Sequence, residues 1–300
     1  MRPRGFLLSI VCCAAMMSSP PRCLPQSGSP WLVRRYRPGE TLQYNMTATN
    51  QEKNTRTHYE ARASGVVKTD TGGTFFEEYT WSNLRINDRR VALPTSSRNF
   101  RQRLSLSPAY RLAIPDLGGI HPALVGPVVD FLTFYADVQL AMRDPSLAQQ
   151  GDHIYVNDGG VNSWADGRRI LTGEDAIDYD ITLSDVDLRD SVVTLVVRHV
   201  PPAHPAIASR APWMHAPVEE TPNNWVQVAK TDSGGYVASV GKETFVATIR
   251  LSLVDGRVLT AALDNNVDVM ERECRDSSLT RCGPPVRYTI TRRIQIDEGR

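Results

Sequence analysis

The sequence has 300 residues, enough for one large domain or two modest ones, and 34 lysines and arginines stand against 33 aspartates and glutamates. A formal net charge of +1 provides no broad basic surface of the kind that binds nucleic acid or an anionic membrane. The composition therefore excludes nucleic acid as the expected partner.

The N-terminus has the charged and apolar regions of a secretory signal peptide. Arg2 and Arg4 precede an apolar run over residues 5–17, which is too short to span a bilayer. We expect a cleaved signal within 1–19, a flexible lead over 20–36 and one β-rich domain over 37–300, with no transmembrane segment in the mature chain. Only four of the cationic residues are lysines, an arginine bias typical of GC-rich bacterial genomes. The predicted location is the periplasm or the outside of a bacterial cell.

Alternating apolar residues predict three strands in the first third of the chain. Leu42, Tyr44 and Met46 share one face of the first strand, and polar residues occupy the other. Further strands are expected over 59–68 and 75–86, with a glycine turn between them. These three strands are predicted to form a meander.

A change of period predicts one helix over 127–142. Apolar residues recur there at intervals of three and four, and Pro127 suits a first helical turn. About 15 residues at 1.5 Å each span roughly 22 Å, enough to cross one face of a sheet. The recurring residues are Val128, Phe131, Leu132, Tyr135, Val138 and Met142.

The middle of the chain predicts hairpins, two strands and a long loop. Residues 151–168 are rich in glycine, aspartate and asparagine, which favour tight turns. The alternation of the next strand breaks near Ser184 and Asp185, and a continuously apolar strand follows over 192–200. Residues 201–222 contain six prolines and no periodicity, which predicts an extended loop.

The last third has the clearest alternation. Apolar residues alternate over 245–253 and return over 259–269, and a final strand over 286–296 is interrupted in polarity only by Arg292. Cys274 and Cys282 lie in the connection before that strand. We expect them to form a disulfide once the chain reaches an oxidising compartment.

Motifs for catalysis are not found. The glycines before Lys242 are spaced one residue too far apart for a phosphate-binding loop, and a strand rather than a helix is expected after them. The Gly-x-Ser-x-Gly elbow of serine hydrolases does not occur. The sequence therefore predicts no catalytic residue and no cofactor.

Metal binding is not expected either. The spacing of His199, His204 and His215 matches no usual zinc pattern. A group of acidic residues could supply oxygen ligands for calcium, but alternation places the middle ones on the solvated face of a strand. That group comprises Asp175, Asp178, Asp180, Asp185 and Asp187.

One short segment resembles a known group. Arg37-Pro38-Gly39-Glu40-Thr41-Leu42-Gln43-Tyr44 resembles the opening strand, Gly-Glu-x-Leu-x-Tyr, of uncharacterised periplasmic β proteins of bacteria. These are similar in turn to the lipoprotein-localisation half-barrel, which shelters acyl chains. The resemblance covers about eight residues, implies a half-barrel that binds an apolar ligand, and assigns no functional residue.

The expected fold is mainly β: a curved antiparallel sheet, half-barrel-like, with one packed helix, the alternative being a β-sandwich with a filled core. The expected function is that of an exported, non-catalytic binding or carrier protein for an apolar, lipid-like ligand. One alternative is a cell-envelope assembly protein that contacts another envelope protein through a sheet edge or the proline-rich loop. Another is a hydrolytic enzyme whose site is assembled from distant positions.

The candidate ligand-binding residues come from the segments with clear periodicity and from the proline-rich loop. In that loop Trp213 and Met214 are candidates for a movable apolar cover, the alternative being a packed or disordered connector. The candidates are Phe131, Tyr135, Phe245, Ile249, Leu251, Leu259, Leu263, Tyr288 and Trp213.

Overall fold

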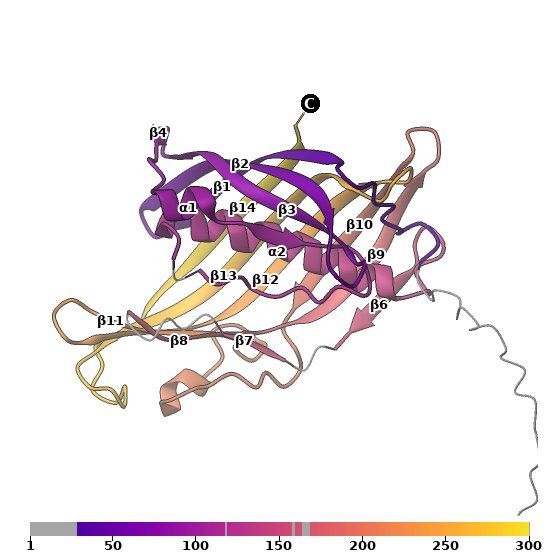
Figure 1. Ribbon diagram of the computed structural model, residues 1–300. Coiled ribbons are helices and arrows are strands. Elements are labelled where there is room, and N and C mark those ends of the chain that lie inside the picture. Colours follow the sequence, from indigo (N-terminus) through magenta and orange to yellow (C-terminus); the bar gives the residue numbers. More distant parts are fainter. Residues whose placement is uncertain (1–28, 118, 158–159, 164–168, 300) are drawn as a thin grey trace, which may run out of the picture.

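The computed structural model describes residues 29–117, 119–157, 160–163 and 169–299, so the predicted signal peptide and part of the predicted hairpins lie outside the described residues. The fold is mainly β, with one large antiparallel sheet that does not close into a barrel and one long helix that crosses it (Figure 1). The curved sheet with one packed helix is therefore confirmed, and the sandwich alternative does not apply.

The predicted strands occur in the predicted order, together with others that were not predicted, and the chain's first long strand lies beside its last. Their bounds are β1 (Thr41–Glu52), β2 (Thr55–Thr69), β3 (Phe75–Ile86), β4 (Arg89–Arg90), β5 (Gln102–Leu104), β6 (His153–Val156), β7 (Val161–Ser163), β8 (Ile170–Ala176), β9 (Asp178–Asp187), β10 (Val192–Val200), β11 (Trp225–Lys230), β12 (Tyr236–Ser252), β13 (Val258–Cys274) and β14 (Val286–Glu298). Four of these strands, β4, β5, β8 and β11, were not predicted. The main path of the sheet is β4-β3-β2-β1-β14-β13-β12-β10-β9-β6. The predicted meander of β1, β2 and β3 is confirmed.

A bulge explains the break in alternation near Ser184. Thr194 of β10 pairs with Asp185, but the next residue, Leu195, pairs with Leu183, so Ser184 is the extra residue on β9. An extra residue turns the side chains that follow it to the other face of the strand. The predicted irregularity is confirmed.

A second bulge, in the β12–β13 hairpin, was not predicted. Arg250 pairs with Thr260, and Leu251 pairs with Val258, so Leu259 has no partner on β12. Val258 is buried in the core, whereas Leu259 is half-buried and outside it. The placement of Leu259 on the apolar face by simple alternation is therefore corrected.

The sheet forks along β12. Its second half pairs with β10, while its first half pairs with β11, which continues to β8 and β7 (Figure 1). Asn224 is fully buried at the fork and bonds to both sides of it. Its Nδ2 donates to the carbonyls of Ala176 (3.0 Å) and Glu243 (3.1 Å), and its Oδ1 accepts from the Glu243 N–H (2.7 Å). One side chain thus satisfies backbone groups that the fork would leave unpaired.

The long helix, α2 (Pro122–Arg143), begins earlier than predicted. Pro122 occupies the first turn, and the Ala123 N–H donates to Nδ1 of the capping residue His121 at 3.2 Å. Pro127 lies inside the helix, where it removes one backbone hydrogen bond but does not end the helix. A five-residue helix, α1 (Thr95–Asn99), precedes α2 in the chain.

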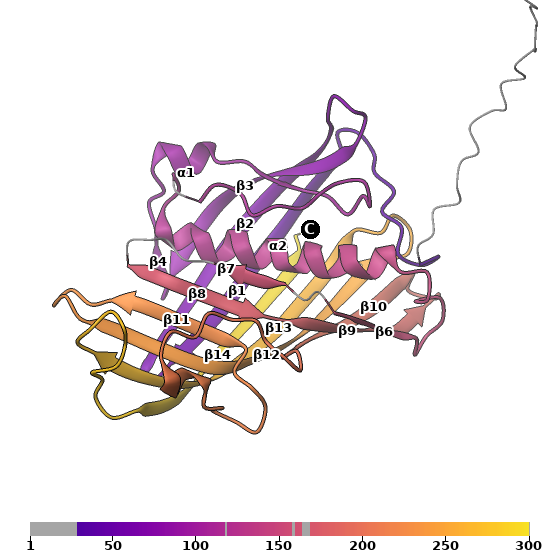
Figure 2. The same ribbon diagram turned by 90° about the horizontal axis from the view of Figure 1, so that it is seen from below.

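The main core lies between α2 and the concave face of the sheet (Figures 1 and 2). On another side of the helix, Gln139 donates from Nε2 to the carbonyls of Ser105 (3.3 Å), Ser107 (3.1 Å) and Tyr110 (2.8 Å), which holds the segment after β5 along α2. Among the described residues, α2 is the one helix whose length and composition would suit a membrane span, and most of it is buried in this core.

The proline-rich segment 201–222 packs on the face of the sheet opposite the one that α2 covers. Val269 and Met270 are neighbours on β13, so their side chains point to opposite faces. Val269 packs in a small cluster with Trp225, whereas Met270 packs with Met214 of the proline-rich segment. Apart from one 3-10 turn, η1 (Pro212–His215), this segment contains no helix or strand.

Candidate functional site between the helix and the sheet

Five of the predicted ligand residues lie together in the main core. Phe131, Tyr135, Ile249, Leu251 and Leu263 are each no more than 5% exposed. The Phe131 ring centroid is 5.2 Å from that of Tyr135 and 4.9–5.6 Å from three aromatic rings of β1 and β3. Aromatic side chains therefore fill the space around Phe131. Phe245 is half-buried at the edge of the same core.

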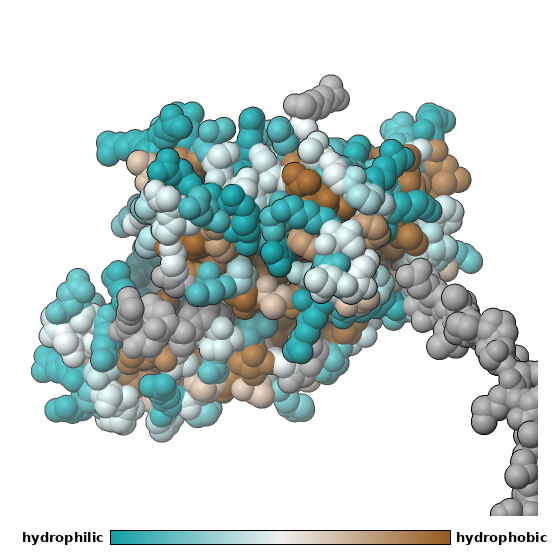
Figure 3. All heavy atoms as spheres, viewed as in Figure 1, coloured by the Kyte–Doolittle hydropathy of each residue, from teal (hydrophilic) through white to brown (hydrophobic). Residues whose placement is uncertain are grey.

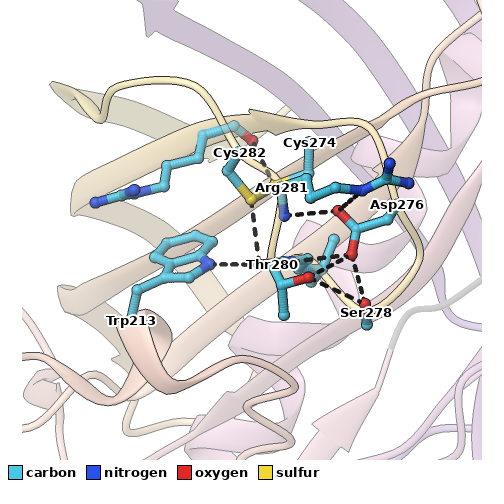
Figure 4. Close-up of a disulfide and its surroundings, with 9 residues drawn as sticks. Trp213, Cys274, Asp276, Ser278, Thr280, Arg281 and Cys282 are labelled. Atoms are coloured by element: carbon cyan, nitrogen blue, oxygen red, sulfur yellow. Dashed lines mark hydrogen bonds and ion pairs between the residues drawn. A yellow bond between two sulfur atoms is a disulfide. The ribbon is translucent and has the colours of Figure 1, made fainter.

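The structure does not bring Tyr288 and Trp213 to that group. Tyr288 packs with Trp225 farther along the strands. The Trp213 Nε1 donates to the carbonyl of Leu279 (3.0 Å), and the Arg272 guanidinium lies 5.2 Å from the Trp213 ring centroid. Figure 4 shows Trp213 beside the loop closed by the Cys274–Cys282 disulfide. The disulfide is confirmed, but Trp213 covers its loop and not the face on which α2 lies.

Besides Gln139, three sets of buried side chains that each contain a carboxylate bind α2 to the rest of the molecule. The first surrounds Glu77 of β3, which is 1% exposed. Its carboxylate accepts from Arg34 Nε (3.0 Å), from the Tyr79 hydroxyl (2.9 Å) and, through a short hydrogen bond, from the Tyr135 hydroxyl of α2. Burial raises the pKa of Glu77, while the Arg34 charge opposes that rise. Residues before β1 are thereby joined to β3 and to α2.

The other two sets use Asp130 and Asp137, which are seven residues apart and share one side of α2. Asp130 is 3% exposed and accepts from the Tyr59 hydroxyl and from Arg292. Asp137 is 1% exposed, and its Oδ1 lies 2.8 Å from Nε2 of His199. Sequence reasoning missed both aspartates, although they are the only charged residues in the predicted helix 127–142. Charged residues at that spacing in an apolar helix were the available signal.

His199 and Arg292, which contact these two aspartates, belong to one row across the concave face, which we call the polar row. Its members stand opposite one another on β10, β12, β13, β14 and β1: His199, Phe245, Asn265, Arg292 and Asn50. The row two residues away on the same face is apolar: Val197, Ala247, Leu263, Ile294 and Ala48. The polar row therefore marks the edge of the apolar surface that α2 covers.

Several buried polar atoms in and beside the polar row lack a hydrogen-bond partner among the described residues. They are Asp137 Oδ2, His199 Nδ1, Asn50 Oδ1, Arg292 Nε and Glu243 Oε2. Because a buried polar atom without a partner loses the hydrogen bond it had in water, such atoms are rare in folded proteins. A concentration of them beside one helix indicates a place where water or a ligand binds.

Two carboxylates near the polar row interact electrostatically, since the Asp175 charge acts on Glu243. Glu243 of β12 precedes Phe245 by two residues on the same face, and its Oε1 accepts from Asn265 Nδ2 at 3.0 Å. Asp175 of β8 accepts from Asn162 Nδ2 at 2.8 Å. Burial raises the pKa of Asp175 to about 6; burial, together with the charge of Asp175, raises the pKa of Glu243 to about 8.

The residues considered for metals do not converge. The described part of the chain contains no group of three histidine, cysteine, aspartate or glutamate side chains arranged to hold a metal ion. His199 lies in the core, while His204 and His215 are exposed in the proline-rich segment. Asp178 is 1% exposed and accepts from the Tyr155 hydroxyl (2.5 Å). Its side chain is therefore buried, whereas alternation placed it on the solvated face of the strand.

The sequence matches no known family model and no curated protein. Function therefore has to be argued from the site itself.

Proposed function

We propose that the chain is an exported, non-catalytic binding or carrier protein for an apolar, lipid-like ligand, and that α2 occupies the ligand's place while none is bound. The observation that carries the proposal is the cover of the concave face: its apolar rows are buried by one helix and not by a second sheet. An acyl chain removes apolar surface from water as a helix does, because hydrophobic burial is non-directional. Either can therefore occupy the same face.

The connections of α2 are compatible with its leaving the sheet. Residues 105–121, apart from residue 118, and 144–152 contain no helix or strand, so α2 can move without separating any paired strands. Hydrophobic side chains also reach the surface in the band of the molecule that contains α2 (Figure 3). The contacts of Tyr135, Asp130 and Asp137 with the sheet oppose this movement. Their strength sets how often the apolar face is open.

Export is part of the proposal and is supported by two features. Arg2 and Arg4 with the apolar run after them match a secretory signal. The Cys274–Cys282 disulfide suits an oxidising compartment. The proposed compartment is the periplasm or the cell exterior.

The test combines native mass spectrometry of protein purified from its own host with titration of a fluorescent fatty acid. We expect copurified lipid and saturable fatty-acid binding. Tyr135→Phe removes one contact of α2 while Arg34 and Tyr79 still hold Glu77. Because one hydrogen bond contributes about 1 kcal/mol, this variant should bind the fatty acid roughly fivefold more tightly.

Val246→Ala is the control, since Val246 is 40% exposed on β12. It should bind like the unmodified protein. The proposal is rejected if neither the unmodified protein nor Tyr135→Phe binds fatty acid and no lipid copurifies.

A further inference from the structure

The concave side of the sheet carries more negative than positive charge next to the polar row. Four carboxylates lie next to the polar row. Asp130 is paired with the Arg292 guanidinium, and Asp137 is in contact with His199. Asp175 and Glu243 accept hydrogen bonds from the side-chain amides of Asn162 and Asn265, which carry no charge. Among the described residues, this pair of carboxylates therefore has no cation of its own within ion-pair distance.

The unpartnered atoms here are mainly acceptors. The Nε2 of His199 faces the Asp137 carboxylate, so in the neutral ring Nε2 holds the proton and Nδ1 is a bare acceptor. Asp137 Oδ2 and Asn50 Oδ1 are also acceptors, and Glu243 Oε2 becomes one when that carboxyl ionises; one unpartnered donor, Arg292 Nε, lies beside them. His199 and Asp137 are 4% and 1% exposed, so their free atoms are largely withdrawn from bulk solvent. Atoms of this kind are satisfied by a ligand that donates hydrogen bonds.

Aromatic rings stand beside the same atoms. The centroid of the His199 ring lies 3.5 Å from that of Phe245 and 4.7 Å from that of Tyr179. Phe245 and Tyr179 therefore pack against the imidazole itself and shield it from water, which strengthens electrostatic interactions there. Charge and hydrogen-bonding capacity decide the class of ligand.

We propose that Glu243, Asp175 and the free acceptors of His199 and Asp137 form a binding site for a primary ammonium group. An ammonium ion has three N–H donors, one positive charge and no acceptor, which matches acceptors that lack donors and carboxylates that lack a cation. A guanidinium would need a planar, bidentate arrangement of carboxylates, and a metal would need a ligand cluster that the described residues do not form. The site does not depend on α2 leaving the sheet, so it stands apart from the carrier function.

Proton release accompanies binding at this site. The groups that face Glu243 are Asp175 from β8, Asn265 from β13 and Arg292 from β14, and the Asp175 charge makes ionisation of Glu243 harder while Arg292 makes it easier. With a raised pKa of about 8, Glu243 holds its proton at pH 7 in the free protein. The ammonium charge replaces that proton, so Glu243 ionises on binding.

The experiment is isothermal titration of the intact protein at pH 7 in two buffers of different ionisation enthalpy. The three probes are propylammonium, dodecylammonium and dodecanoate. We expect both amines to bind with release of up to one proton, and Glu243→Gln and Asp175→Asn each to weaken amine binding about tenfold or more, as loss of a charge-assisted contact does. Asp264→Asn is the matched control, because Asp264 lies on β13 with its side chain 67% exposed.

The probes also separate the sources of the ammonium group and the two proposals. Much tighter binding of dodecylammonium than of propylammonium assigns the group to the head of an amphiphile, and equal binding assigns it to a small free amine. Dodecanoate binding without amine binding supports the carrier function and overturns the ammonium site. Amine binding without dodecanoate binding supports the ammonium site and overturns the carrier function. The site is also overturned if both Glu243→Gln and Asp175→Asn remain folded by circular dichroism and bind the amines unchanged.

Discussion

The Asp137 carboxylate and the His199 imidazole meet 2.8 Å apart, at the edge where the apolar contact between α2 and the sheet ends. Asp137 comes from the long helix and His199 from β10, and each is at most 4% exposed. A buried polar contact of this kind restricts α2 to one rotation about its axis and one position along the sheet. Apolar packing alone would allow several rotations and several positions of α2.

Removing either partner of this contact should destabilise the fold, because the remaining group would be buried without its partner. We expect Asp137→Ala and His199→Ala each to lower the free energy of unfolding by about 3 kcal/mol. The double variant should lose clearly less than the sum of the two. Urea denaturation measures all three, with exposed Asp264→Ala as a control expected to change stability by less than about 0.5 kcal/mol. Strict additivity would show that the two side chains do not interact.

The bulge in the β12–β13 hairpin separates two leucines that simple alternation treats alike. Leu251→Ala should lower the free energy of unfolding by about 2–5 kcal/mol, because it leaves a cavity in the main core. Leu259→Ala should lower it by less than about 1 kcal/mol, because that side chain is half-buried outside the core. Equal losses in urea denaturation would contradict the register shift at Leu251.

This pair of leucines shows what could be predicted from the sequence. Alternation, the change of period at the helix and the glycine and proline turns depend on neighbours close in the chain, and they predict the strands and the helix. The disulfide prediction depends instead on the two cysteines that lie outside the N-terminal segment. A bulge depends on how two strands pair. The irregularity at Ser184 was visible because the polarity pattern itself changes there, whereas at Leu259 an apolar residue conceals the shift.

The candidate site could not be predicted in the same way. Arg292 was visible only as an interruption in the last strand, and His199 only as a histidine near the proline-rich segment. Their membership of one row depends on the register of five strands, which local pattern does not determine. The pairing of Asp130 with Arg292 further requires the helix to lie across that row.

Stability should fall as pH rises through the range in which Asp175 and Glu243 ionise. Their folded-state pKa values of about 6 and about 8 lie above the ordinary values of 3.8 and 4.5. Between the ordinary and the raised values the folded chain holds protons that the unfolded chain has lost, so the free energy of unfolding decreases with pH. The contribution is fully present below the ordinary values and is lost as pH passes 6 and then 8.

Glu243→Gln should remove the upper part of this dependence. Urea denaturation of the unmodified protein and the variant between pH 5 and 9 measures the difference, in which the titration of other groups cancels. We expect the two curves to diverge from the lowest pH measured up to about pH 8, because the ordinary and raised pKa values of Glu243 are 4.5 and about 8. Parallel curves over that range would show that Glu243 ionises normally in the folded protein.

The Cys274–Cys282 disulfide should stabilise the end of the sheet on which Trp213 packs. The two cysteines are eight positions apart, and a loop of that size stabilises a fold by roughly 2–3 kcal/mol. We expect the Cys274→Ser, Cys282→Ser double variant to lose that amount in urea denaturation and to shift the tryptophan fluorescence. Trp213→Phe, which keeps the disulfide, identifies the part of the signal that comes from Trp213. Mass mapping that finds two free thiols in exported protein would contradict the pairing.

The pairing of β1 with β14 has a consequence for the order in which the molecule folds. β1 and β14 are far apart in the chain but are neighbours in the middle of the sheet, so its two halves cannot join until β14 has been synthesised. Long-range pairings of this kind slow folding, because a long loop must close before any contact stabilises it. During synthesis the chain therefore keeps its central strand edges unpaired until β14 is available.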